Sequence, residues 1–378
     1  MKKIRNVLFL THGSFDGGAN LCLLDIIRNL DRSRFNPIVI MPNHGWLDYQ
    51  LSDLDVDYYI FRYAWWIVDN DYGKLHLLVS RFRYFIQSIV ATKRIACFCK
   101  KKQIDIIHSN SCTIEIGQAV SKKMHIPHVW HVREILTNYA WRWVIGKRHL
   151  FRSFSSAQSV ICISEFVRTY LESECGEKIK SVHVIYDGVE ECDTRERKFD
   201  RFTVLSQAGT WAKGKDEVIN VLRELRDCKI PMDFYVIGDE HEYQGIGNEY
   251  LNIRMFRGLP LDEYRRFRSR CHISLTTSIN EAFGRITVEP MSEGTLVIAA
   301  NRGASPELIH DGVDGILYEY GNANDLKEKI IDVANHYEDY QLMIENARIN
   351  AKRFTAKENA FSVMKQYDAL FQEVDIKK

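Results

Sequence analysis

Residues 278–315 read SINEAFGRITVEPMSEGTLVIAANRGASPELIHDGVDG, and this stretch decides how the rest of the chain is interpreted. Two carboxylates stand eight residues apart in it, Glu281 and Glu289, with the tripeptide FGR between them. The apolar run 273–276 predicts a strand, and residues at helical spacing then continue to Gly294, a typical helix stop. Glu281 is therefore expected in a loop at the carboxyl edge of a sheet, and Glu289 about one turn inside the following helix.

The start of that helix predicts an anion site. The first N–H groups of a helix have no partner within the helix and attract phosphate. Gly284 has no side chain, so a ligand can come close to the backbone. Two carboxylates beside this cradle would accept hydroxyl groups, which suits a nucleotide diphosphate carrying a sugar. An isolated pair of glutamates is also compatible with a surface helix whose carboxylates are solvated.

Length and composition restrict the class of protein. A chain of 378 residues is long for one core and sufficient for two domains. Its 51 basic and 50 acidic side chains nearly cancel, so the global charge does not indicate a nucleic-acid binder. Nine scattered cysteines without disulfide or zinc spacing favour a reducing cytosol. The apolar run near the N-terminus is too short for a signal peptide, and no run approaches the roughly 18 apolar residues of a membrane span.

Strand and helix patterns alternate along both halves. Residues 7–10 predict a first strand, which is followed by a turn with Gly17 and Gly18, an amphipathic helix and a second strand at 37–41. Such alternation is typical of α/β folds with open parallel sheets. The charged segment 190–201 lacks apolar periodicity and predicts a linker. We therefore expect an N-terminal domain over 1–190, a C-terminal domain over 191–355 and a final helix over 356–378.

The runs EAFGRITVEPMSEG (281–294) and VIAANRGASPELIHDGVDGILY (297–318) resemble the donor-binding segment of retaining GT-B glycosyltransferases of the family 4 group. The resemblance implies two Rossmann-like doubly wound domains facing a cleft, with the last helix crossing back to the first domain. It also implies that Glu281 faces the donor sugar, that Glu289 meets the ribose hydroxyls, and that the turn at Gly303 closes over the site.

The second half offers further donor-side candidates. Gly209 follows a predicted strand, and Lys213 and Lys215 stand near a glycine turn where phosphate could bind. By the resemblance, Lys213 contacts the diphosphate with Lys215 as a substitute, whereas the family's arginine after the first glycine is replaced by Thr210. The turn at Gly238 resembles the family's turn near the nucleotide, and 257–259 would read the base through the backbone. The donor-side candidates are Gly17, Gly18, Gly209, Lys215, Gly238, Asp239, Gly258, Phe283, Gly284, Arg285, Ile286 and Glu289.

In the first half, a buried strand pattern, IPHVWHVRE, ends at His131, Arg133 and Glu134. HVRE resembles the family's histidine-containing loop beneath the donor sugar, which implies that His131 bonds a sugar hydroxyl and that Arg133 or Glu134 helps to place the acceptor. We expect the catalytic set to be Glu281, His131 and Lys213.

No cofactor or metal is implied besides the sugar-nucleotide co-substrate. A lysine and a helix N-terminus can stabilise a leaving diphosphate, and no convincing DxD-like pair occurs. The resemblance implies retention by same-face attack, with transfer to a glycan or lipid-linked hydroxyl in cell-surface polysaccharide or glycoconjugate synthesis.

Two basic aromatic runs, 75–102 and 138–154, could lie on an anionic membrane at its cytoplasmic face. The alternative is that their apolar sides pack on the sheet and their charges are solvated.

Three other functions remain open. A non-catalytic GT-B-like partner would fit Thr210 in place of the arginine. A sugar-nucleotide epimerase would share the two-domain architecture but act on the donor alone. A nucleic-acid binder would explain the basic aromatic runs but not the glutamate segment.

Overall fold

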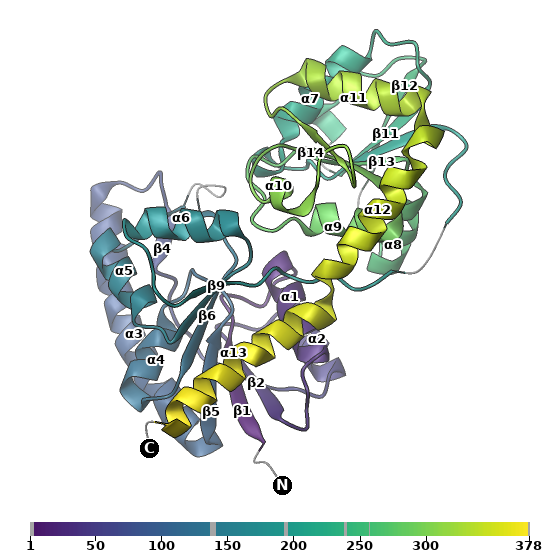
Figure 1. Cartoon of the computed structure of the whole chain (residues 1–378). Coiled ribbons are helices and arrows are strands. Elements are labelled where there is room, and N and C mark those ends of the chain that lie inside the picture. The colour runs from purple at the N-terminus through teal and green to yellow at the C-terminus, as the bar shows by residue number, and fades with distance from the viewer. Residues whose placement is uncertain (1–3, 137–140, 193–195, 238–239, 257, 377–378) are drawn as a thin grey trace. The chain divides into compact units, whose positions relative to one another are not determined.

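The computed structural model describes residues 4–136, 141–192, 196–237, 240–256 and 258–376 (Figure 1). The chain divides into two compact units. Unit 1 comprises Met1–Gly188 and Ala356–Lys378, and unit 2 comprises Val189–Thr355. The expected boundary at 190 lies beside the first division, and the expected boundary at 355 coincides with the second.

Unit 1 contains a sheet of seven parallel strands in the order β3-β2-β1-β5-β6-β8-β9. The strands are β1 (Arg5–Leu10), β2 (Phe35–Met41), β3 (Asp57–Ile60), β5 (Ile104–Ser109), β6 (His128–Val132), β8 (Ser159–Cys162) and β9 (Val182–Val184). The helices are α1 (Gly18–Arg28), α2 (Trp46–Asp53), α3 (Lys74–Lys102), α4 (Ile116–Met124), α5 (Lys147–Ser155), α6 (Glu165–Cys175) and α13 (Ala356–Ile376). A separate antiparallel pair is formed by β4 (Ile67–Asp69) and β7 (Trp141–Trp143).

Alternate residues of β1 explain the layers of unit 1. Val7 and Phe9 pack with α1, α2 and α13, whereas Leu8 and Leu10 pack with α3 and α4. Side chains of a strand point alternately to the two faces, so a strand that is apolar at every position needs helices on both. The last helix, α13, packs against α1 (Figure 1). Unit 1 is therefore a doubly wound layer structure closed by the C-terminal helix.

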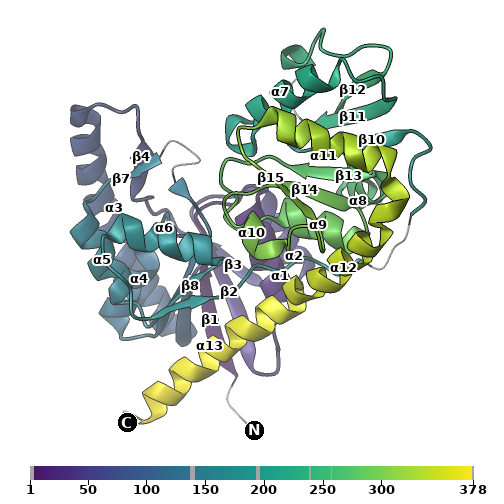
Figure 2. The ribbon, with the colours of Figure 1, turned by 45° about the horizontal axis from the view of Figure 1, so that its top comes forward.

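Unit 2 contains six parallel strands in the order β12-β11-β10-β13-β14-β15. The strands are β10 (Phe202–Ser206), β11 (Met232–Ile237), β12 (Leu251–Phe256), β13 (Ile273–Thr276), β14 (Leu296–Ala300) and β15 (Ile316–Tyr318). The helices are α7 (Lys215–Leu225), α8 (Leu261–Arg270), α9 (Arg285–Glu293), α10 (Ser305–Leu308), α11 (Ala323–Asn335) and α12 (Gln341–Ala351). Short 3-10 helices are Trp211–Lys213, Glu240–Glu242, Tyr337–Tyr340 and Lys352–Phe354. Figure 2 shows α11 on one side of the sheet and α8 and α9 on the other.

Each sheet has one point where the strand order reverses. In unit 1 this point lies between β1 and β5, and in unit 2 it lies between β10 and β13. At such a point the two following loops diverge to opposite faces and leave a crevice at the carboxyl ends of the strands, where ligands bind in doubly wound folds. The loops after these four strands are therefore the places to search for a site.

The second basic aromatic run contributes large side chains to the core in its described part. Phe154 is fully buried, with its ring centre 4.2 Å from that of Trp130. Trp66 stacks on Trp130 at 5.4 Å, and Trp143 packs edge-on against Trp66. Phe154 is therefore not available for the membrane surface expected over 138–154, whereas Trp141 and Trp143 are half-buried and 138–140 lie outside the described residues.

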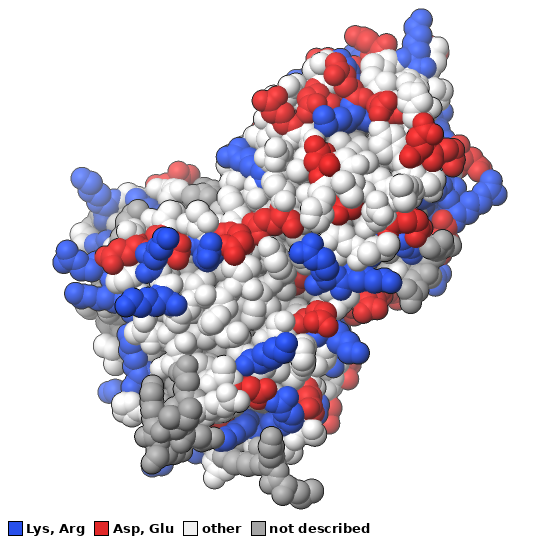
Figure 3. All heavy atoms as spheres, in the orientation of Figure 1, with Lys and Arg blue, Asp and Glu red and all other residues white. Residues whose placement is uncertain are grey.

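Other surface features match the composition. Basic and acidic side chains are interspersed over the face drawn in Figure 3. All nine cysteines are free. Among the described residues, no helix is both long and apolar enough to cross a bilayer.

The segment that enters unit 2 is fastened by a lysine. Lys198 Nζ donates hydrogen bonds to the carbonyl oxygens of Ser269 (2.9 Å), Cys271 (2.7 Å) and Gly294 (2.8 Å) and to Thr295 Oγ1 (3.3 Å). Burial lowers the pKa of Lys198 to about 8. One ammonium group thus satisfies backbone oxygens at the end of α8, before β13 and after α9, and it ties the incoming segment to three elements of unit 2.

Replacing Lys198 with methionine should destabilise unit 2. Methionine keeps the apolar stem but leaves the carbonyl oxygens without this donor, and an unsatisfied buried polar group costs about 1–3 kcal/mol. We expect the free energy of unfolding in urea to fall by about 2 kcal/mol or more. Lys229→Met, which changes an exposed lysine of the same unit, is the control. Equal stability of the two variants would contradict this account.

Candidate functional site

The loops at the reversal point of unit 2 bring a lysine and a glutamate together. Lys213, at the end of a 3-10 turn after β10, places Nζ 2.5 Å from Oε1 of Glu281, which follows β13. Ser278 Oγ donates to the same carboxylate oxygen at 2.8 Å. The two side chains lie 68 residues apart in the sequence, and the parallel pairing of β10 with β13 makes their loops neighbours.

Close backbone contact fixes the lysine loop. Gly214 has φ +78°, and a Cβ at this position would lie 1.8 Å from the carbonyl oxygen of Thr277. Thr277 Oγ1 donates to the carbonyl oxygen of Lys213 at 3.0 Å, and the N–H of Ile279 donates to that of Ala212 at 3.1 Å. A side chain at position 214 would therefore separate the two loops.

A second glycine fixes the glutamate loop. Gly303 has φ +63°, and a Cβ there would lie 2.5 Å from the backbone nitrogen of Glu281. The N–H of Ala304 donates to the carbonyl oxygen of Glu281 at 2.9 Å. The turn after β14 thus lies against the glutamate loop.

The helix α9 begins where the sequence predicted. Gly284 precedes it with φ +109°, and Gly294 ends it with φ +76°. Both conformations favour glycine, because a Cβ is strained at positive φ. The side chain of Phe283 is buried, with its ring centre 5.9 Å from that of Phe354. Ile286 is half-buried, so Gly284 and the first turn of α9 form the anion-attracting end.

Glu289 lies between two arginines. Oε2 accepts from Arg268 Nη1 at 2.6 Å, and Oε1 accepts from Arg285 Nε at 3.0 Å. The fully buried Arg268 also makes two 2.6 Å bonds to Glu293. Burial raises the pKa of Glu289, but the charges of Arg268 and Arg285 outweigh burial, so its pKa falls below the ordinary value. An ionised carboxylate has about four acceptor positions, so Glu289 can still accept ribose hydroxyl groups.

The other donor-side candidates are dispersed. Lys215, the first residue of α7, pairs with Glu242 at 2.6 Å and does not reinforce Lys213. Gly209 follows β10, and Gly258 is exposed with φ +55°. Gly238 and Asp239 lie outside the described residues. In unit 1, Gly17 caps α1 and Gly18 is its first residue.

His131, Arg133 and Glu134 are buried at the carboxyl end of β6 in unit 1. Arg133 Nε donates to Asn110 Oδ1 at 3.0 Å, and its Nη1 donates to Asp187. Glu134 Oε2 accepts from the N–H of Cys112 at 2.9 Å. The sequence did not single out Asn110 or Asp187. Both residues follow β-strands, and Asp187 lies in the sequence YDGVE (186–190).

Three buried side chains in this region each have one ring nitrogen or carboxylate oxygen without a hydrogen-bond partner: His12 Nδ1, His131 Nε2 and Glu134 Oε1. His12 follows β1, His131 lies near the end of β6, and Glu134 follows β6, so these atoms lie at the carboxyl ends of the two strands. Burial lowers the pKa of His12, and the charge of Glu134 opposes this shift. Buried polar atoms are normally satisfied, so their concentration at the strand ends indicates a place for a polar ligand.

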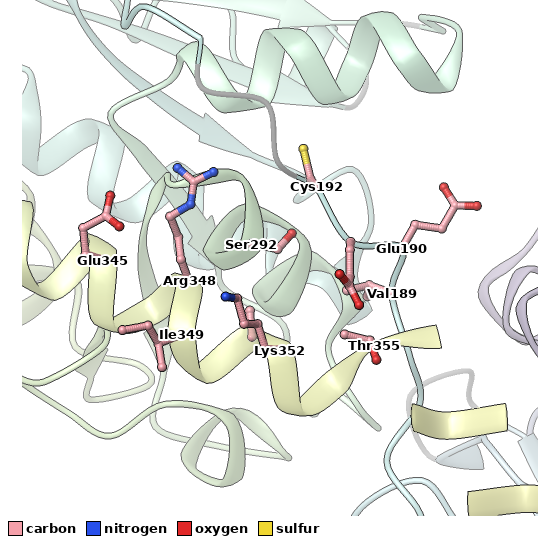
Figure 4. A pocket seen from close by; sticks show the side chains of 11 residues that line it. Val189, Glu190, Cys192, Ser292, Glu345, Arg348, Ile349, Lys352 and Thr355 are labelled. Carbon is pink, nitrogen blue, oxygen red and sulfur yellow. The ribbon is translucent and has the colours of Figure 1, made fainter. Parts of the chain in front are cut away.

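The pocket in Figure 4 is a different feature. It has a volume of about 190 Å³ and is lined by the segment 189–192, by Ser292 near the end of α9, and by Glu345, Arg348 and Lys352. None of the predicted site residues lines it. Among the described residues, no three His, Cys, Asp or Glu side chains are grouped as metal ligands would be.

Comparisons with known proteins identify the family and the fold. The model for Glycosyltransferase Family 4 matches residues 16–191, and the model for Glycosyl transferases group 1 matches residues 193–350. An uncharacterized glycosyltransferase of Methanocaldococcus jannaschii is 27% identical over 88% of this chain and 97% of its own length.

Solved structures have the same fold. HepE of Anabaena in complex with UDP has a TM-score of 0.75 at 20% identity, covering 96% of this chain and 100% of that chain. The same protein with UDP-glucose has a TM-score of 0.72 at 20% identity, covering 96% and 99%. The lipopolysaccharide outer core galactosyltransferase WaaB in its apo form has a TM-score of 0.67 at 14% identity, covering 97% and 99%.

The two family models together match nearly the whole chain, and each corresponds to one of the two parallel-sheet units. The chain is therefore a glycosyltransferase of the GT-B fold that resembles glycosyltransferase family 4.

Proposed function

We propose that this protein transfers a sugar from a nucleotide-diphosphate sugar to a hydroxyl group of a glycan or lipid-linked acceptor, with retention of configuration and without a metal. We further propose a role in cell-surface polysaccharide or glycoconjugate synthesis. The pairing of Lys213 with Glu281 at the reversal point of unit 2 is the observation that carries this proposal.

The donor-side chemistry follows from charge. The Lys213 ammonium and the N-terminus of α9 would stabilise the negative charge that develops on the leaving diphosphate. Glu281 would accept a hydroxyl of the donor sugar, and Glu289 the ribose hydroxyls. The leaving phosphate would take the proton of the attacking hydroxyl on the same face of the sugar, so no separate base is assigned.

The relatives support particular parts of this proposal. HepE was solved with UDP and UDP-glucose, which makes a uridine nucleotide the first donor to test. WaaB is a lipopolysaccharide galactosyltransferase, which supports the cell-surface role. Thr210, in place of the family's arginine, leaves Lys213 with a larger share of the diphosphate contacts and keeps a non-catalytic role as the second candidate.

Nucleoside diphosphates and their sugars should raise the melting temperature of the protein. A ligand that binds only the native state at 100 times its Kd stabilises it by about 2.7 kcal/mol. We expect UDP and one UDP-sugar to shift the melting temperature in the presence of EDTA. The stabilising sugar is then offered with candidate acceptors, and NMR of the product gives its anomeric configuration. An inverted anomer or an EDTA-sensitive reaction would contradict the mechanism, and epimerisation without acceptor would indicate the epimerase alternative.

Glu281→Gln should reduce kcat for transfer while leaving the fold intact. The amide keeps the shape but loses the charge that holds Lys213, and a single preorganised group in an active site contributes on the order of 100-fold. Glu224→Gln is the matched control, because Glu224 pairs with Lys327 at 3.5 Å on the surface of the same unit. Turnover by Glu281→Gln near that of the control would remove Glu281 from the catalytic set.

The helix α3 carries an exposed apolar stripe in unit 1. Eight of its apolar side chains are 48–77% exposed and recur every three or four residues: Leu75, Leu78, Val79, Phe82, Phe85, Ile86, Ile89 and Val90. Only its later part packs on the sheet, through residues such as Ile95 and Cys99. The alternative in which the apolar side is covered therefore holds for the end of α3 but not for its first two-thirds.

Charge indicates what this stripe would contact. The 29 residues of α3 include eight Lys or Arg and no Asp or Glu. Beside the stripe, α3 and α4 enclose a groove of about 340 Å³ with an apolar lining that includes Phe85 and Ile89, and with Lys93, Lys122 and Lys123 among its residues. Apolar insertion combined with basic flanks is typical of helices that lie in an anionic bilayer surface. We therefore propose that α3 docks on the membrane.

Phe82→Glu combined with Ile86→Glu should abolish co-flotation with vesicles of equal phosphatidylglycerol and phosphatidylcholine at low salt. The wild type should float with these vesicles, float less at high salt because surface charges are screened, and not float with phosphatidylcholine alone. Leu342→Glu, at a 73% exposed position of α12, is the control. No flotation of the wild type, or a dimer that the double variant dissociates, would contradict membrane docking.

A further inference from the structure

A buried chain of hydrogen-bonding groups runs from the C-terminal helix to His131 within unit 1. The hydroxyl of Tyr367, on α13, lies 2.6 Å from His108 Nδ1, on β5. His108 Nε2 lies 3.2 Å from His131 Nδ1, on β6. All three side chains are fully buried. Tyr367 and His108 were not singled out by the sequence, although His108 contacts His131, which was.

Arg133 determines the direction of this chain. Its Nη2 lies 3.2 Å from His131 Nδ1, and a guanidinium group can only donate. His131 Nδ1 must therefore be an acceptor, which places the proton of this ring on Nε2. His108 Nε2, which also faces His131 Nδ1, must then carry a proton and donate it. His108 Nδ1 is left as the acceptor of the Tyr367 hydroxyl.

Both rings must be neutral for this arrangement. Burial lowers the pKa of His131, and the charges of Arg133 and His108 lower it further. Burial also lowers the pKa of His108, with Arg133 acting in the same direction. Protonation of either ring would place a second positive charge next to Arg133.

The chain ends in a donor that has no partner among the described residues. His131 Nε2 is buried and unpaired. The nearest carboxylate oxygen, Asp187 Oδ1, lies 4.0 Å away and is engaged by Arg133 Nη1. A buried N–H normally has an acceptor, so this one is oriented for an oxygen that a ligand supplies.

We propose that Tyr367 and His108 act with Arg133 as positioning residues that hold His131 in the tautomer with the proton on Nε2, ready to donate to a hydroxyl oxygen of the transferred sugar. The identity of that oxygen rests on the proposed function, whereas the fixed tautomer rests only on the geometry of unit 1. One of the groups that support this arrangement at His131 thus comes from the last helix of the chain, 236 residues further along.

Tyr367→Phe tests the chain with little change in packing. Phenylalanine preserves the edge-on contact of the Tyr367 ring with Phe35, whose ring centre is 5.5 Å away, and removes only the hydroxyl. The matched control is Tyr318→Phe in unit 2, because Tyr318 is also fully buried and its hydroxyl bonds a side chain, Glu217, at 3.4 Å.

Histidine tautomers are read directly by long-range proton–nitrogen NMR of protein labelled with ¹⁵N-histidine. The signals of the thirteen histidines are assigned for the two rings from the spectra of His108→Gln and His131→Gln. We expect both rings to be neutral with the proton on Nε2 in the wild type and in Tyr318→Phe. In Tyr367→Phe we expect mixed tautomers of His108, because its Nδ1 loses the hydroxyl donor. A proton on Nδ1 of His131 in the wild type, or unchanged tautomers in Tyr367→Phe, would overturn the proposal.

Kinetics then tests what the donor does. With UDP-glucose, or whichever nucleotide sugar supports transfer, Tyr367→Phe should lower kcat about tenfold relative to Tyr318→Phe. Among the monodeoxy analogues of that donor, the one lacking the contacted hydroxyl should be used equally by both variants. Altered tautomers with equal kcat would overturn the role of His131 in transfer. Absence of transfer by the wild type with any nucleotide sugar would contradict the proposed function and leave the tautomer result intact.

Discussion

Direct contact between backbone segments at positions 214 and 303 determines the geometry of unit 2. Parallel pairing of adjacent strands brings the loops after β10 and β13 to one edge, but pairing alone does not set their separation. Gly214 lies against the carbonyl group of Thr277, and Gly303 lies against the backbone of Glu281. Because no side chain intervenes, three consecutive loops at the sheet edge are layered on one another, and Lys213 meets Glu281 as a consequence of that layering.

The buried ion pairs of Arg268 with Glu289 and Glu293 have a different role. Arg268 joins Glu289 and Glu293 of α9 to α8, and burying such a group without carboxylates against it would be costly. The arrangement holds Glu289 ionised and oriented before any ligand arrives. Arg268 and Arg285 each engage one oxygen of Glu289, so its remaining lone pairs point in a limited set of directions. Because Glu289 lies about one turn inside α9, this acceptor is held at a fixed distance from the anion-attracting start of the helix.

Local signals in the sequence predicted the elements well, and long-range contacts could not be predicted. The strand 273–276 and the helix end at Gly294 were both confirmed, because β-branched residues favour strands and glycine adopts the positive φ of a helix end. The same reasoning misjudged Phe154, since an aromatic side chain fits a core as well as a membrane surface. The hydrogen bond between His108 and the hydroxyl of Tyr367 could not be inferred from the sequence, because the two residues lie on different elements, β5 and α13.

The two units share a topology but prepare polar groups in opposite ways. In unit 2 a diphosphate would need positive charge, and with threonine at position 210 that charge comes from Lys213, held ready by Glu281. In unit 1 the carboxylate of Asp187 is already engaged by Arg133, so a second cation beside Arg133 would have no counter-ion of its own. A neutral imidazole with a fixed proton offers a donor without adding charge. Under the proposed function, unit 2 would recognise the charge of the donor, and unit 1 would recognise the direction of a hydrogen bond.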